Sequence, residues 1–301
     1  MAELKIESLR EFADAAKAEI EKRYGVSVEF SECKKNNRAT MLALAIAEGD
    51  ENIRPSIYME SYFEMYKKQG FEAVIDAIWE VYESNRIREH LDMSVVTDYG
   101  RAKHLLRAWI INYGMNKDAL RTIPHRRYMD LAIVAYLDIQ NIGFGELGGT
   151  IWVNDEIKRM WGVTDDEIID RALCTVRRDV VIMNMKDCLT QSGVDIDAET
   201  RGCDKGDRMF VLTNKKQFRG AIGMTDMATL RIVAKTVNRA KIYILPSSIH
   251  EVILYFTEDE SDIAELYNLV GQVNRDVVEP GFILSNNVYV YDAERDELTI
   301  A

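Results

Sequence analysis

The sequence has few residues of the kinds that mark linkers, disulfide frameworks or membrane segments. Its 301 residues include only 4 prolines and 17 glycines, which argues against long disordered linkers. The four cysteines, Cys33, Cys174, Cys188 and Cys203, form no CxxC pair, which indicates reduced thiols and neither a disulfide framework nor a zinc site. The N-terminal residues contain no apolar signal core, and no apolar run reaches the ~20 residues of a membrane span. We therefore expect a cytoplasmic protein.

Positive charge is also scarce. The chain has 38 lysines and arginines against 50 aspartates and glutamates, a net charge of −12. Long-range electrostatics therefore argues against direct binding to nucleic acid or to an anionic membrane. The simplest interpretation of the acidity is solubility. A protein that mimics nucleic acid would need acidic side chains spaced regularly on one surface, which a sequence cannot show.

The motifs of common enzymes and cofactor sites are incomplete. Residues 143–148 match GxGxxG, but strand chemistry follows where a dinucleotide fingerprint must open a helix, so we predict a hairpin turn. His250 and Glu251 begin an HExxH motif that Leu254 interrupts. Residues 195–199 resemble the start of a calcium loop, but the later glycine and glutamate are misplaced. We expect no cofactor and no metal.

The order of predicted elements indicates an α+β fold. Apolar content of 47% and charged content of 29% are ordinary for a globular protein. We expect antiparallel or mixed β-sheets flanked by helices, because the strand–helix alternation is too irregular for a doubly wound parallel sheet. Two closely packed lobes, residues 1–124 and 125–301, are predicted to join near Pro124.

Periodicity and capping residues predict the helices. Asn154 can cap one helix, and Thr164 with Glu167 forms a capping box for the next. Apolar stripes predict further helices over 5–24, 71–82, 99–113, 225–237 and 261–273. The later half of the third stripe, 109–112, could instead be a strand.

Short β-branched runs predict the strands, and a polar, glycine-containing stretch at 190–207 predicts a loop. The predicted strands are 26–30, 40–47, 53–58, 129–137, 150–153, 209–213, 221–223 and two runs within 243–254, with a closing hairpin over 288–300.

The most informative stretch is Tyr243–Leu254, in which two apolar runs flank a short polar hinge. Pro246 is expected to end the first strand because it cannot donate a ladder hydrogen bond. Ser247 and Ser248 can turn the backbone ahead of His250 and Glu251. The structural interpretation is a partly buried histidine bonded to local backbone with a surface glutamate. The functional interpretation makes His250 an acid/base group or a ligand contact.

A second candidate precedes the predicted central strand at 129–137. His125, Arg126 and Arg127 supply three potential cations in an acidic chain, and arginine suits carboxylate or phosphate. The alternative is that these arginines pair with carboxylates of this chain. Asp130, which follows them, is a further catalytic candidate.

Five stretches carry a family resemblance: Asn52–Tyr58, Asn112–Arg126 with Asp130-Leu131-Ala132, Met160–Thr164 (MWGVT), Tyr243–Leu254 (YILPSSIHEVIL) and Asn287–Asp292. With these stretches the chain resembles a family of uncharacterised proteins from anaerobic Firmicutes that is catalogued as a domain of unknown function. The resemblance spans most of the chain and implies a bacterial, cytoplasmic accessory protein. It gives no activity or catalytic residue.

Three functions remain open from the sequence. The first is a non-catalytic binding or regulatory protein, whose partner is an unknown protein or a small anionic ligand contacted by Ser247, Ser248, Glu251, Arg126 and Arg127. The second is a hydrolase or nucleotide-handling enzyme. It would bring the catalytic candidates into one cleft, with the arginines holding an anion. The third is an acidic inhibitor protein that mimics nucleic acid. The first is favoured because no nucleophile, metal or phosphate motif is intact, although catalytic triads can assemble from distant positions.

Overall fold

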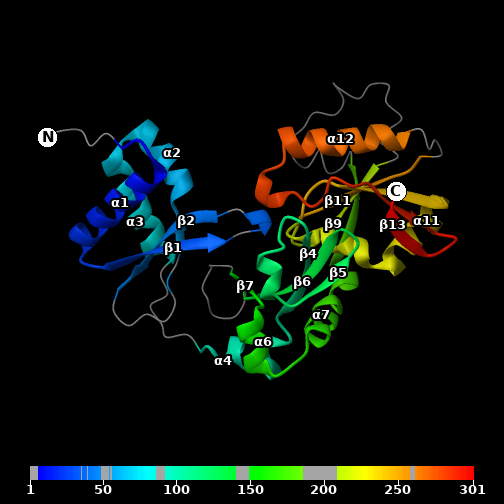
Figure 1. Ribbon diagram of the computed structural model, residues 1–301, viewed down its shortest axis with the longest axis horizontal. Helices are drawn as coiled ribbons and strands as arrows, with labels where there is room; N and C mark the ends of the chain where they lie inside the picture. The colour runs from blue at the N-terminus through cyan, green and yellow to red at the C-terminus, as the bar shows by residue number, and fades with distance from the viewer. Residues whose placement is uncertain are drawn as a thin grey trace. The chain divides into compact units, whose positions relative to one another are not determined.

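The computed structural model describes residues 6–34, 36–38, 40–48, 54, 56–85, 92–139, 149–185, 209–257 and 262–301 (Figure 1). Contacts between Cα atoms divide the chain into two compact units, Met1–Val95 with Asp138–Thr150 (unit 1) and Val96–Leu137 with Ile151–Ala301 (unit 2). Pro124 lies inside unit 2, because strands before and after it pair in one sheet. The predicted α+β class is confirmed.

Unit 1 contains a three-stranded antiparallel sheet, in the order β1-β2-β3, and three helices. Side chains from the sheet and from the helices form one hydrophobic core. Ser8 and Glu11 form a capping box at the start of α1, and Gly25 ends that helix at φ 69°. Phe12, Ile75 and Leu44 are fully buried where helices and strands meet. The elements are α1 (Leu9–Tyr24), β1 (Ser27–Lys34), η1 (Asn36–Arg38), β2 (Thr40–Ala47), β3 (Ser56–Tyr58), α2 (Met59–Gln69) and α3 (Phe71–Asn85).

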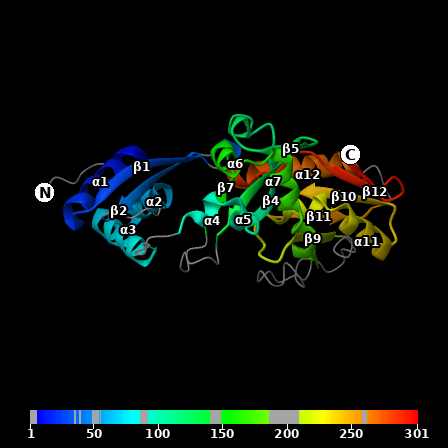
Figure 2. The ribbon, with the colours of Figure 1, turned by 90° about the horizontal axis from the view of Figure 1, so that it is seen from below.

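Unit 2 begins with a small antiparallel sheet in which β6 is central, between β4 and β5, and also pairs with β7. Helix α7 packs on β4 and β5 (Figure 2). Asn154 and Thr164 cap α6 and α7 as predicted. The elements are α4 (Ser94–Thr97), α5 (Tyr99–Ala102), β4 (Leu106–Asn112), η2 (Ala119–Arg121), β5 (His125–Tyr128), β6 (Leu131–Asp138), β7 (Thr150–Trp152), α6 (Asp155–Trp161) and α7 (Asp165–Leu173).

A six-stranded antiparallel sheet, in the order β13-β12-β10-β11-β9-β8, completes unit 2. Leu266 and Val270 of α12 pack on Tyr243 and Leu245 of β10. The elements are α8 (Val176–Asp179), β8 (Val180–Asn184), β9 (Met209–Asn214), η4 (Gly220–Thr225), α11 (Met227–Val237), β10 (Lys241–Pro246), β11 (Val252–Tyr255), α12 (Asp262–Asp276), η5 (Pro280–Phe282), β12 (Tyr289–Asp292) and β13 (Glu297–Ile300).

The strand predicted at 221–223 is wrong, since this segment belongs to the 3-10 helix η4. Residues 220–224 are all buried, and η4 contacts β4 of the small sheet together with β9 and β11 of the large one. A β-carbon on Gly223 would come within 2.6 Å of Leu212 Cδ2, so glycine permits this close approach. The apolar run is therefore a buried connection between the two sheets of unit 2.

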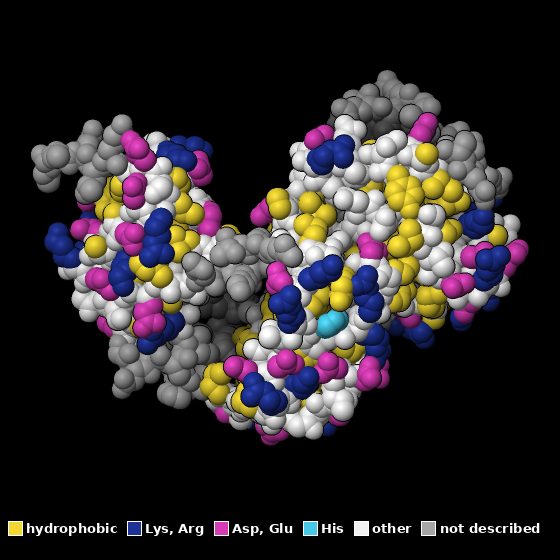
Figure 3. All heavy atoms as spheres, in the orientation of Figure 1, with side chains coloured by type: hydrophobic (Ala, Val, Ile, Leu, Met, Phe, Trp, Pro, Cys, Tyr) yellow, Lys and Arg dark blue, Asp and Glu magenta, His cyan; other side chains and the backbone are white. Residues whose placement is uncertain are grey.

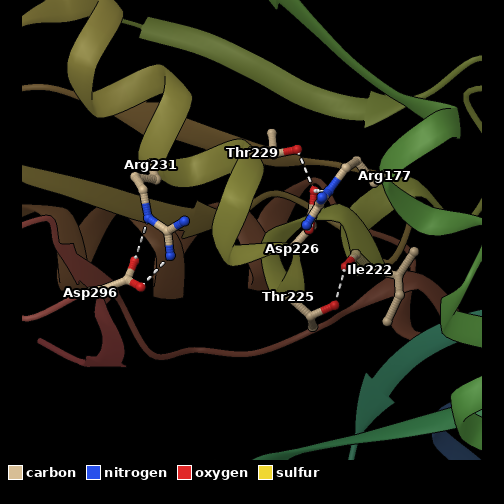
Figure 4. A network of polar contacts seen from close by, with 7 residues as sticks. All are labelled: Arg177, Ile222, Thr225, Asp226, Thr229, Arg231 and Asp296. Atoms are coloured by element: carbon tan, nitrogen blue, oxygen red, sulfur yellow. Dashed lines mark hydrogen bonds and ion pairs between the residues drawn. The ribbon is translucent and has the colours of Figure 1, made fainter.

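Two ion pairs fix α11 to its neighbours (Figure 4). Arg177 of α8 pairs with Asp226 at 3.0 Å, and Arg231 pairs with Asp296 in the β12–β13 turn. Burial would raise the pKa of Asp226, but hydrogen bonds from Arg177 and Thr229 outweigh it, so the pKa is lowered. Arg177 and Arg231 are largely exposed, so these pairs orient α11 more than they stabilise it.

Within the described ranges, no helix combines the length and the apolar character needed to cross a membrane.

Candidate functional site

His250 lies in a tight turn, residues 247–251, between β10 and β11. Its backbone N–H donates to Ser248 Oγ at 3.0 Å, and the Ser248 N–H donates to the Glu251 carbonyl at 3.1 Å. Ser247 Oγ donates to Glu251 Oε1 at 3.2 Å. The strand β10 ends at Pro246 as predicted. Ser247, Ser248 and Glu251, all proposed ligand contacts, therefore also determine the shape of the turn.

The imidazole of His250 is half-buried and held on several sides. Its Nδ1 accepts a hydrogen bond from the backbone N–H of Arg219 at 3.1 Å. The Phe218 and Phe282 rings lie 5.4 and 4.9 Å away, centroid to centroid. Burial lowers the pKa of His250, and the nearby charge of Arg219 lowers it further. The ring is therefore neutral at pH 7, and because Nδ1 is an acceptor the proton resides on Nε2.

Arg219 joins this turn to the small sheet of unit 2. Its side chain is only 8% exposed. The guanidinium carbon lies 3.9 Å from the ring centroid of Trp109, 4.4 Å from that of Tyr136 and 4.7 Å from that of Phe218. Cation–π attraction of this kind is stronger when the cation is desolvated. We call His250, Phe218, Arg219, Phe282 and Trp109 the His250 cluster.

The loop that carries Phe218 and Arg219 is held by its own first residue. Asn214 Oδ1 accepts the backbone N–H groups of Lys216 at 3.1 Å and Phe218 at 3.2 Å, and Asn214 Nδ2 donates to the Phe218 carbonyl at 2.8 Å. Arg219 itself has φ 58°, a left-handed conformation that costs a non-glycine residue roughly 1–2 kcal/mol. Strain of this kind often accompanies functional sites. The loop thus presents a strained and well-anchored arginine to the cluster.

The cationic candidates at β5 divide between the two faces of the small sheet. Arg126 pairs with Asp166 at 2.9 Å and Asp170 at 2.8 Å on α7. These are carboxylates of the same chain, as the structural interpretation of the arginines requires. The neighbours of Arg126 in sequence point the other way because side chains alternate along a strand. Arg127 lies with its guanidinium carbon 3.6 Å from the centroid of the Tyr113 ring.

His125 is on the same sheet face as Trp109, since both residues are register partners of Val134 in β6. Their backbones are therefore two strand spacings apart, about 10 Å. The Nδ1–H of His125 donates to the Ile123 carbonyl at 2.9 Å. Among the described residues, no hydrogen bond or ring contact joins His125 to His250. The single cleft of the enzyme hypothesis therefore stays a prediction.

Asp130 accepts three hydrogen bonds from neutral donors at the β5–β6 turn. Ser285 Oγ donates at 2.7 Å, Asn287 Nδ2 at 3.0 Å and Tyr289 OH at 2.8 Å. Ser285 and Tyr289 are fully buried. This network links the small sheet to the segment that leads into β12. The catalytic role of Asp130 stays a prediction, and these three hydrogen bonds give the residue a structural role as well.

We expect unit 2 to lose stability above about pH 10, where tyrosine in an unfolded chain ionises. Burial raises the pKa of Tyr128 to about 12, and burial together with the Asp130 carboxylate raises the pKa of Tyr289. As the pH rises, the two tyrosine hydroxyl groups therefore lose their protons at a lower pH in the unfolded chain than in the folded one. Below about pH 10 the two tyrosines contribute no pH dependence to the free energy of unfolding. Above about pH 10 this free energy falls by about 1.4 kcal/mol per pH unit for each of them.

Urea unfolding between about pH 9 and pH 11 measures this loss. Tyr289→Phe removes one of the tyrosines with a raised pKa, so its free energy of unfolding should fall less steeply with pH than that of the wild type. Parallel slopes would contradict the assignment of Tyr289.

One family matches residues 9–293 of this chain, which include both the His250 cluster and the Asp130 network. The chain belongs to DUF5688, a family of unknown function. The match confirms the predicted relation to a domain of unknown function, while the bacterial source stays a prediction. No curated protein matches the DUF5688 chain. No solved structure matches it either.

Several segments that the sequence singled out in the DUF5688 chain lie outside the described residues. The GxGxxG match at 143–148, the calcium-like segment at 195–199 and the loop at 190–207 lie outside the described residues. In the described parts of the chain, no group of three or more histidine, cysteine or acidic residues could hold a metal. On the face drawn in Figure 3, acidic and basic side chains are interspersed, so this face does not favour the nucleic-acid mimic.

Proposed function

We propose that the DUF5688 chain is a non-catalytic binding or regulatory protein whose unit 2 binds a small anionic ligand at the His250 cluster. The observation that carries the proposal is the bond from the Arg219 N–H to His250 Nδ1 at 3.1 Å. It places a hydrogen-bond donor, Nε2–H, on a half-buried ring beside a buried positive charge. A donor next to a cation suits an anionic acceptor.

The same bond argues against a general base at this position. In a neutral imidazole only one ring nitrogen can accept a hydrogen bond, and in His250 this nitrogen, Nδ1, already accepts one from the Arg219 N–H. Nε2 therefore donates and cannot accept a proton without loss of this contact. A fixed donor selects a ligand acceptor, which supports binding over hydrolysis.

The loop of the cluster also concentrates positive charge in an acidic chain. Lys215, Lys216 and Arg219 occur within five residues, and both lysines are exposed. The net charge of the whole chain is −12. Charges gathered locally in this way raise the local concentration of anions. They support a ligand that carries a carboxylate or phosphate.

Isothermal titration with AMP, ribose 5-phosphate and inorganic phosphate tests the proposal. His250→Ala removes the donor, so we expect the affinity for at least one of these anions to fall about tenfold. His125→Ala is the matched control, because it removes an imidazole of the same unit that, among the described residues, no hydrogen bond or ring contact joins to the cluster. Its affinity should equal that of the wild type. Absence of binding by all three anions, equal affinity of His250→Ala and wild type, or turnover of a bound ligand would contradict the proposal.

A further inference from the structure

Phe282 is an exposed aromatic side chain on a fixed backbone. It is 41% exposed, more than any other phenylalanine, tyrosine or tryptophan among the residues whose exposure the structure describes. Its N–H donates to the Glu279 carbonyl at 2.8 Å, and its carbonyl accepts the Ile249 N–H at 2.9 Å. Pro280 further restricts this short 3-10 turn. An exposed ring is thus held in place directly beside the His250 turn.

The ring of Phe282 and the imidazole of His250 meet edge to face. Their centroids are 4.9 Å apart and their planes lie at 77°. Phe218 lies on the imidazole at 5.4 Å, so the two phenylalanines restrict the rotation of the histidine. The exposed part of Phe282 is free of this contact and adjoins a ring whose Nε2–H is a donor. A flat ligand ring with an acceptor nitrogen or oxygen could contact both groups at once.

We infer that the ligand carries a planar heteroaromatic ring and is a nucleoside monophosphate. The inference rests on the function proposed above and specifies its ligand. The base stacks on Phe282 and accepts a hydrogen bond from His250 Nε2. Stacking on an aromatic side chain suits every nucleobase, because each has a π-face.

The phosphate of this ligand is negatively charged and is attracted by nearby lysine side chains. Lys215 and Lys216 are exposed on the loop that carries Phe218. Their field favours a nucleotide over the uncharged nucleoside. We therefore expect AMP to bind more tightly than adenosine, and the difference to shrink as salt is added.

The experiment uses the fluorescent nucleotide 2-aminopurine riboside 5′-monophosphate with the full chain, because stacking quenches 2-aminopurine emission. Phe282→Leu keeps an apolar side chain but removes the ring, and it should weaken binding about tenfold. Phe282→Trp keeps an aromatic ring at this position and should keep both the quenching and the affinity. Since Phe282 is 41% exposed and its backbone hydrogen bonds are kept, we expect the melting temperatures of both variants to stay within a few degrees of the wild type.

Ribose 5-phosphate separates the failure of this inference from the failure of the proposed function. In one outcome ribose 5-phosphate binds as tightly as AMP, and Phe282→Leu binds like the wild type. This result would overturn the inference that a nucleobase stacks on Phe282 and would leave the proposed anion site intact. Should neither compound nor inorganic phosphate bind, both proposals are overturned. Binding of the nucleotide without quenching would also overturn stacking on Phe282.

Discussion

Replacing Gly220 with alanine is expected to destabilise unit 2 by about 3 kcal/mol. A β-carbon at this position would lie 2.4 Å from Thr213 Oγ1, 2.5 Å from the Asn214 backbone nitrogen and 2.7 Å from the His250 carbonyl oxygen. Two of these neighbours are backbone atoms and cannot move aside as a flexible side chain would. The Gly220 N–H also donates to the same His250 carbonyl at 2.9 Å. The clash therefore falls on the junction that supports the His250 turn.

Urea unfolding followed by tryptophan fluorescence measures this effect in the right part of the chain. Trp109, Trp152 and Trp161 belong to unit 2, while Trp79 is the one tryptophan of unit 1. A lower midpoint with an unchanged slope would indicate lost stability and an otherwise similar native state. Ligand affinity should fall as well, because the turn that holds His250 must shift.

Gly271→Ala is the matched control for Gly220→Ala. Gly271 lies inside α12, and the nearest atom to an added β-carbon is Arg275 Nη1 at 3.4 Å, the end of a flexible side chain. Alanine is favoured over glycine in a helix interior by about 1 kcal/mol, so this variant should be more stable than the wild type. A loss of stability at Gly271, or none at Gly220, would contradict the packing described for these positions.

The structure agrees with the sequence where the signal is local. Asn154 Oδ1 accepts the Ile157 N–H at 2.9 Å, and Thr164 Oγ1 accepts the Glu167 N–H at 3.2 Å. Caps of this kind depend on residues three apart, so the sequence contains all the information they need. Helix α6 also ends at Gly162 in the left-handed conformation, as glycine at that position predicts.

Agreement is lost where tertiary contacts decide the conformation. Helical spacing predicted a helix over 99–113, but the chain has a short helix and then β4, Leu106–Asn112. The strand alternative for 109–112 is confirmed, because β6 pairs with this segment along its whole length. Residues 221–223 are equally apolar and form a 3-10 helix, because two sheets enclose them.

The candidate site shows the same division. The polar turn around His250 was recognisable from Pro246 and the serines that follow it. Arg219 was missed, because its bond to His250 joins residues 31 positions apart and its left-handed backbone has no glycine to signal it. The available signal was compositional: Lys215, Lys216 and Arg219 gather positive charge in an acidic chain. Exposure, which distinguishes Phe282, is a property of the folded chain alone.

Replacing Asp130 with alanine is expected to cost about 3 kcal/mol of stability, whether or not the chain has an activity. The substitution leaves Ser285, Asn287 and Tyr289 without the carboxylate that accepts their hydrogen bonds. Ser285 and Tyr289 are fully buried, so their donors cannot turn to bulk water. A catalytic Asp130 would instead be replaceable at little cost to the melting temperature.

A double-mutant cycle with Tyr289→Phe separates these roles. Tyr289→Phe alone should cost about 1 kcal/mol, and the double variant should cost less than the sum of the two, because the lost hydrogen bond is counted in both single variants. Asp118→Ala is the control for charge removal, since the Asp118 carboxylate is 64% exposed in its pair with Arg121. It should change stability by less than about 0.5 kcal/mol. Additive costs at Asp130 and Tyr289, or a wild-type melting temperature for Asp130→Ala, would argue that this network does not hold the small sheet to the β12 segment.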